Sequence, residues 1–138
     1  MSAKPMPVPD ADSRPFWEGC REHRLRIERC SECAAARFPP ASLCPHCRSS
    51  RSEWITASGR GTVFSWIVVR HPVPKDMYAH EVPYVVALVE LEEGVRLPTN
   101  IVGCEPHAIR AGMQVEVVFE DVSAGVTLPR FRPAQGQA

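Results

Sequence analysis

The chain has 138 residues, with 16 Lys or Arg and 16 Asp or Glu, so its formal net charge is zero. This length suits one domain, or one small domain with a metal module. A neutral chain lacks the basic surface that holds nucleic acid by its phosphates. No run of about 18 apolar residues is present to span a membrane, and none follows Lys4 to form a secretory signal. We therefore expect a cytoplasmic protein with reduced cysteines and no membrane partner.

The N-terminal part is predicted to be a tail followed by a helix. Residues 1–13 are polar, carry three prolines and are expected to form a flexible tail. A short helix is expected from Arg14 to about His23, because Pro15 suits a first helical turn. Cys20 falls on the apolar face of this helix and is expected to be a buried, inert thiol.

Two matched cysteine pairs follow, Cys30-Ser-Glu-Cys33 and Cys44-Pro-His-Cys47, with ten residues between them. Each pair places two thiolates on one tight turn, and two such turns complete the tetrahedral ligand set of a structural zinc ion. Iron in the same cage and two disulfides are the alternatives. His46 is expected to face solvent. We predict one zinc held by Cys30, Cys33, Cys44 and Cys47, which would fold the protein and do no chemistry.

The rest of the chain predicts a mainly β fold. Leu25 and Ile27 alternate with charged residues, which indicates a strand leading into the first cysteine pair. Fourteen prolines and eight glycines separate further short strands. These strands are expected at 53–57, 62–71, 84–91, 97–102, 114–120 and 127–132, with a loop at 72–83 and one helical turn within 106–112. We predict an N-terminal helix and rubredoxin-like zinc ribbon over 14–49, a five-stranded OB-fold barrel over 50–133, and a tail at 134–138.

Particular side chains suggest two alternative functions. Strand alternation places Phe64, Trp66 and Arg70 on one face, where aromatics could stack the bases of a single-stranded nucleic acid. Barrel core or a protein interface is the other interpretation of these aromatics, and the balanced charge weighs against nucleic acid. Cys104 lies near His107, and such a couple could attack a thioester. A thioesterase-type enzyme using Cys104 is the weaker alternative, because no third group orients the couple.

A series of motifs in one order carries a family resemblance. The series is P-F-W, L-R-I-E-R-C, C-x2-C, F-P-P, C-P-x-C, E-W, S-G-R-G-T-V-F-S-W, P-Y-V-V-A-L-V-E-L-E-E-G-V-R-L, G-M-Q-V-E-V-V-F-E-D and L-P-R-F-R-P. Over residues 14–133 it resembles the zinc-ribbon plus OB-fold family of acyl-CoA metabolism, formerly a domain of unknown function. Ala34 and Arg48 depart from the glycines that this family usually carries after each cysteine pair.

The resemblance implies a non-catalytic accessory subunit of a thiolase-fold enzyme, such as a thiolase, ketoacyl synthase or retro-aldolase. We expect it to stabilise that enzyme as a heteromer with two or more copies. Phe38-Pro39-Pro40 and the loop 72–83 are the expected contact segments, because prolines lose little entropy on docking. Acyl-CoA is a candidate ligand. The candidate contacts for its phosphates are Arg60, Arg70, Lys75 and Arg96.

Overall fold

A computed structural model describes residues 4–134, so the predicted tail at 135–138 and residues 1–3 lie outside the described part. Helix α1 (Arg14–Arg21) has a proline in its first turn, as expected. It ends two residues earlier than predicted, because His23 adopts a left-handed φ of 60° that cannot continue a helix. A Cβ on Gly19 would lie 2.7 Å from the Cγ of Arg26, so the glycine allows α1 to pack closely on the strand that follows.

The ribbon half is a three-stranded antiparallel sheet of β1 (Arg26–Cys30), β2 (Ala36–Arg37) and β3 (Ser52–Thr56), in the order β2-β1-β3. Sequence patterning assigns the strand at 53–57 to the barrel domain. That placement is wrong, because β3 pairs with β1 along its whole length. Local patterning predicts a strand but does not reveal its partner, and here the chain returns from the second cysteine pair alongside β1.

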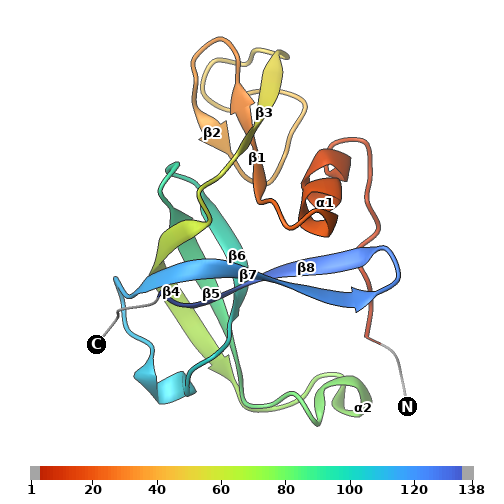
Figure 1. Cartoon of the computed structure of the whole chain (residues 1–138), viewed down its shortest axis with the longest axis vertical. Coiled ribbons are helices and arrows are strands. Elements are labelled where there is room, and N and C mark those ends of the chain that lie inside the picture. Colours follow the sequence, from red (N-terminus) through yellow and green to blue (C-terminus); the bar gives the residue numbers. More distant parts are fainter. Residues whose placement is uncertain (1–3, 135–138) are drawn as a thin grey trace.

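The second half is a closed five-stranded barrel, which confirms the predicted OB fold (Figure 1). Its strands are β4 (Arg60–Val69), β5 (Tyr84–Leu91), β6 (Arg96–Ile101), β7 (Gln114–Ser123) and β8 (Val126–Pro133), in the order β4-β5-β6-β8-β7. The predicted loop at 72–83 contains one short helix, α2 (Lys75–Tyr78), and the predicted helical turn is η1 (Pro106–Ala108). The parallel pair that closes β6 onto β8 rests on Ile101 opposite Phe131.

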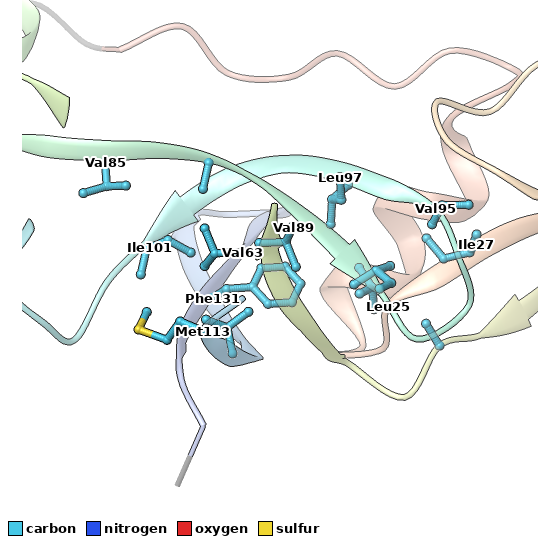
Figure 2. Packing of buried hydrophobic residues seen from close by; sticks show 14 of the residues in the cluster. Leu25, Ile27, Val63, Val85, Val89, Val95, Leu97, Ile101, Met113 and Phe131 are labelled. Atoms are coloured by element: carbon cyan, nitrogen blue, oxygen red, sulfur yellow. The ribbon is translucent and has the colours of Figure 1, made fainter. Parts of the chain in front are cut away.

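One apolar core joins the two halves (Figure 2). Leu25 and Ile27, from the ribbon side, belong to the same buried cluster as Val95 and the barrel residues. Phe131 is fully buried at the centre of the barrel part. The small ribbon therefore obtains its hydrophobic core from the barrel rather than building one of its own.

A β-bulge in β4 overturns the expected shared face of Phe64 and Trp66. The register of β4 on β5 shifts between Val63 and Ser65, so one extra residue is inserted into the alternation. Phe64 therefore points outward and is 48% exposed, whereas Trp66 packs against the core. The aromatic platform that the alternative nucleic-acid interpretation required is not formed.

The core and the bulge predict that replacing two phenylalanines by alanine lowers the free energy of unfolding by unequal amounts. Phe131→Ala should lower the free energy of unfolding by about 3–5 kcal/mol, because it leaves a cavity at a fully buried site. Phe64→Ala, the matched control on the outer face, should cost less than about 1 kcal/mol. Urea unfolding followed by fluorescence measures both. Equal costs would contradict the inward and outward placement of the two rings.

Candidate functional site

The two cysteine pairs form two turns of the same construction. The backbone N–H of Ala34 donates to the Cys30 carbonyl at 3.0 Å, and the N–H of Arg48 donates to the Cys44 carbonyl at 2.8 Å. Ala34 and Arg48 have φ values of 66° and 65°, in the left-handed region that favours glycine. Each non-glycine residue there costs about 1–2 kcal/mol, which other interactions of the turn must offset.

The four sulfurs gather at one point between these turns. Cys30 Sγ lies 3.5 Å from Cys47 Sγ, and Cys33 Sγ lies 3.6 Å from Cys44 Sγ, while all four are within 4.8 Å of one another. A tetrahedral zinc site with Zn–S bonds of about 2.3 Å has sulfurs roughly 3.8 Å apart, so the cluster fits this ion. Both distances far exceed a disulfide bond of about 2.05 Å.

Backbone N–H groups stabilise the charged form of two of the thiols, Cys30 and Cys44. The N–H groups of Glu32 and Cys33 each point to Cys30 Sγ at 3.4 Å, and the N–H of His46 points to Cys44 Sγ at 3.4 Å. Hydrogen bonds, first that of the Cys47 backbone N–H and then that of His46, lower the pKa of Cys44 to about 6, although burial acts in the opposite direction. A thiolate is the form that binds metal. The imidazole of His46 is exposed and outside the cluster, as the sequence analysis expected.

A buried ion pair supports the segment that joins the two turns. Arg37 Nε donates to Glu28 Oε1 at 3.0 Å, and the same oxygen accepts the backbone N–H of Ala41 at 2.9 Å. Ser52 Oγ donates to the other oxygen of Glu28 at 2.7 Å. Alternation with Ile27 places Glu28 on the solvent side, so the sequence does not predict this network. Nothing in the local sequence marks a Glu and an Arg nine positions apart as a buried pair.

The structure does not bring the four candidate CoA contacts together. Arg60 and Arg96 lie at one end of the barrel, where their Nε atoms are 3.2 and 3.1 Å from glutamate oxygens. The guanidinium of Arg96 also lies over the Phe64 ring, 3.7 Å from its centroid. Arg70 and Lys75 follow the other end of β4. A strand of this length, at about 3.3 Å per residue, separates the two groups too far for one phosphate.

The two cysteines outside the cluster lack the features of a nucleophile. Cys20 is fully buried, and burial raises its pKa to about 12. Cys104 is half-buried, and burial together with the Glu105 carboxylate raises its pKa as well. Within residues 4–134, no hydrogen bond joins Cys104 to His107, so the couple proposed for thioester attack is not assembled. For Cys20, its complete burial confirms the buried thiol that the sequence predicted.

Comparison with known families identifies both halves of the chain. Residues 17–53 match the model of the rubredoxin-like zinc ribbon domain of ChsH2, and residues 54–120 match the model of the ChsH2 C-terminal OB-fold domain. The boundary between the two models falls inside β3. None of the helices described between residues 4 and 134 is long and apolar enough to cross a membrane.

Several relatives carry functional descriptions. The chain is 44% identical to a "DUF35 domain-containing scaffold protein" of Methanocaldococcus jannaschii, covering 86% of this chain and 89% of that protein. It is 44% identical to a "Probable enoyl-CoA hydratase alpha subunit" of Thermomonospora curvata, and 40% identical to the "3-oxo-4,17-pregnadiene-20-carboxyl-CoA hydratase alpha subunit" of Mycobacterium tuberculosis. These matches cover 97% and 82% of this chain, but only 41% and 38% of the two hydratase subunits.

Two solved structures share the fold. A chain described as "Ltp2-ChsH2(DUF35) aldolase" superimposes with a TM-score of 0.84 at 44% identity, covering 92% of this chain and 98% of that one. A DUF35 protein of unknown function from Sulfolobus solfataricus has a TM-score of 0.65 at 16% identity over 90% and 86% of the two chains, which shows the fold alone. From the two matched domain models and these similarities, the chain belongs to the DUF35 family of ChsH2-type proteins, with a rubredoxin-like zinc ribbon followed by an OB fold.

Proposed function

We propose that this chain is a non-catalytic accessory subunit of a thiolase-fold enzyme that acts on acyl-CoA. The observation that carries the proposal is the match, over nearly the whole length of both chains, to the DUF35 chain of a structure described as an aldolase. The thiolase fold of the partner comes from the family resemblance of the motifs over residues 14–133. The hydratase subunits among the relatives support an acyl-CoA enzyme and name the competing partner class, an enoyl-CoA hydratase.

The outer side of β4 supplies a surface that suits a protein partner. Phe64, Ile67 and Val73 are 48%, 62% and 77% exposed, and all three lie on β4 or the loop that follows it. The pairing of β4 with β7 covers only Arg60 to Thr62, so within the described chain no strand pairs with the far part of this edge. An apolar strand face beside an unpaired edge favours association with another chain. The contact expected of the loop 72–83 fits this surface, whereas Phe38 packs internally on Phe16.

The same proposal assigns one structural zinc ion to Cys30, Cys33, Cys44 and Cys47. The sulfur geometry and the match to a zinc ribbon model support it. A site with four thiolate ligands has no open position, so bound zinc would supply folding energy and no catalytic step. The ribbon needs that energy, because its sheet is small and β2 has only two residues.

The surface charges disfavour a nucleic-acid function. Four arginines of the barrel are each hydrogen-bonded to a glutamate: Arg60, Arg96, Arg130 and Arg132. A basic groove that follows a phosphate backbone requires unpaired cations. With Trp66 packed against the core, the stacking surface is lost as well. A thioesterase function has even less support, because the Cys104 thiol has no base bonded to it in the described structure.

The zinc assignment predicts about one zinc per chain by elemental analysis of protein purified without chelator. Cys44→Ser should lose the metal and several kcal/mol of stability, because structural zinc binding is folding energy. Cys104→Ser is the control and should keep both. Zinc should be released as the pH falls, since protons compete for the thiolates. A chelated, zinc-free protein with an unchanged melting temperature would contradict the assignment.

The accessory role predicts a stable complex on co-expression with a thiolase-fold enzyme from the same genome. The enzyme should be poorly soluble or poorly active alone, and should co-purify in active form with this chain. Ile67→Asp should reduce co-purification at least tenfold without changing the melting temperature, because a charge on a docking face must be desolvated. Leu43→Asp, on an exposed side chain of the ribbon (54% exposed), is the matched control.

Turnover of an acyl-CoA thioester by this chain alone, abolished by Cys104→Ala, would instead support the thioesterase alternative. Co-purification with an enoyl-CoA hydratase but with no thiolase-fold enzyme would assign the partner to the other class.

A further inference from the structure

A cavity of about 470 Å³ lies at one end of the barrel, lined by residues of the loop 70–83, the adjoining ends of β5 and β6, and the β7–β8 hairpin. In OB folds, the second and third strands form the usual ligand-binding face, together with the loops after the first and fourth strands. The equivalents here are β5 and β6, the loop 70–83, and the tip of the β7–β8 hairpin. The cavity, which we call the hairpin pocket, therefore lies where this fold binds ligands.

The N-terminal segment 4–9, which we call the strap, runs to this pocket. Figure 1 shows the N-terminal trace leaving α1, passing β8 and continuing toward α2. Lys4, Pro5 and Met6 line the pocket, and Lys4 Nζ donates to Glu81 Oε1 at 2.6 Å. Residues 4–6 of the tail predicted at 1–13 are thus in contact with the barrel, and they cover one side of the pocket.

The strap has the sequence K-P-M-P-V-P, in which every second residue is proline. A proline fixes its own φ near −65°, and the residue before a proline is restricted to extended conformations. Each position of the strap is therefore either a proline or the residue before one. Such a segment is extended before it docks, so it loses little conformational entropy on binding.

The pocket offers partners for the prolines of the strap and for its Lys4 cation. The rings of Tyr78 and Tyr84 lie beside each other on its wall, with centroids 6.0 Å apart, and aromatic-lined grooves are the usual receptors of proline-rich segments. Glu81 supplies the acid for the cation, and the hydrogen bond from Lys4 lowers the pKa of that carboxyl. Arg130 is held by Asn100 and Glu120, so this part of the wall is fixed.

The attachment of the strap is weak enough to be exchanged. The side chains of Lys4 and Glu81 are 34% and 44% exposed, and an exposed ion pair contributes little to stability. A tethered segment has an effective concentration on the order of millimolar. A second segment of the same chemistry can therefore replace it when another interface holds that segment nearby.

We propose that the hairpin pocket is a docking site for an extended, proline-spaced peptide that begins with lysine, and that the strap is its intramolecular occupant. The peptide in trans belongs to the partner subunit, so this part of the inference rests on the proposed function. On binding, the partner's segment displaces residues 4–6, and its lysine takes over Glu81 while its prolines contact Tyr78 and Tyr84.

Cys104 lines the same pocket, so its rate of alkylation by iodoacetamide reports whether the pocket is open. The rate is measured for this cysteine alone by mass spectrometry of the full-length protein. Lys4→Glu and Glu81→Lys should each raise it about two- to fivefold, the range that loss of an exposed ion pair allows. The double variant restores the pair with reversed charges and should return to the wild-type rate. Lys75→Glu, on the same loop but outside the pocket lining, is the control.

Synthetic peptides then test docking in trans. The amide of Lys-Pro-Met-Pro-Val-Pro should protect Cys104 in the Lys4→Glu variant at millimolar concentration, whereas Glu-Pro-Met-Pro-Val-Pro should not. In Glu81→Lys the preference of the two peptides should reverse. Unchanged alkylation in both single variants, or opening without protection by either peptide, would overturn the proposal.

A separate measurement distinguishes this inference from the accessory role. Glu81→Lys should lower the yield of co-purified thiolase-fold enzyme, with the wild-type chain as reference. An undiminished yield overturns the docking site in the complex and leaves the accessory role intact. Absence of co-purification by the wild-type chain overturns the accessory role, and with it the partner subunit as the source of the peptide.

Discussion

The structure depends on the burial of Leu25 and Ile27 in one core with the barrel. A three-stranded sheet that includes a two-residue strand cannot remove enough apolar surface from water to be stable alone. Packing these side chains in the barrel core fixes the ribbon on the barrel, and the four sulfurs gather in the part of the ribbon formed by its two cysteine turns. The orientation of the ribbon on the barrel follows from this shared core.

On the proposed function, this arrangement serves binding rather than catalysis. The cysteine cluster has the composition of a closed metal site, and the remaining two thiols have raised pKa values. The barrel arginines that bond to glutamates neutralise the surface locally, which agrees with the zero net charge of the chain. The features left for recognition are the apolar outer side of β4 and the pocket beside the strap, which combines tyrosine rings with the Glu81 carboxylate. Both are typical of a protein that contacts another protein.

The two recognition features lie at different places on the barrel and have different physical characters. The outer side of β4 offers exposed Ile67 and an unpaired strand edge, which suit a broad contact. The hairpin pocket instead combines two tyrosines with one carboxylate, which suits a single extended segment. A partner that uses both gains affinity from the broad contact and orientation from the narrow one, because the second contact becomes intramolecular once the first is made.

The sequence alone determined the features that depend on local spacing. The C-x2-C pairs predicted two turns that face each other, and short strands between glycines and prolines predicted a five-stranded barrel; the structure contains both. Local rules suffice here because a turn or an alternating strand is set by a few consecutive residues. Tertiary structure decided what depends on residues far apart in the chain. The pairing of β3 with β1, the bulge that separates Phe64 from Trp66, and the burial of Glu28 with Arg37 all arise from contacts that no local pattern records. The contact of the strap also depends on residues far apart in the chain, because Lys4 and Glu81 meet only when the barrel has folded.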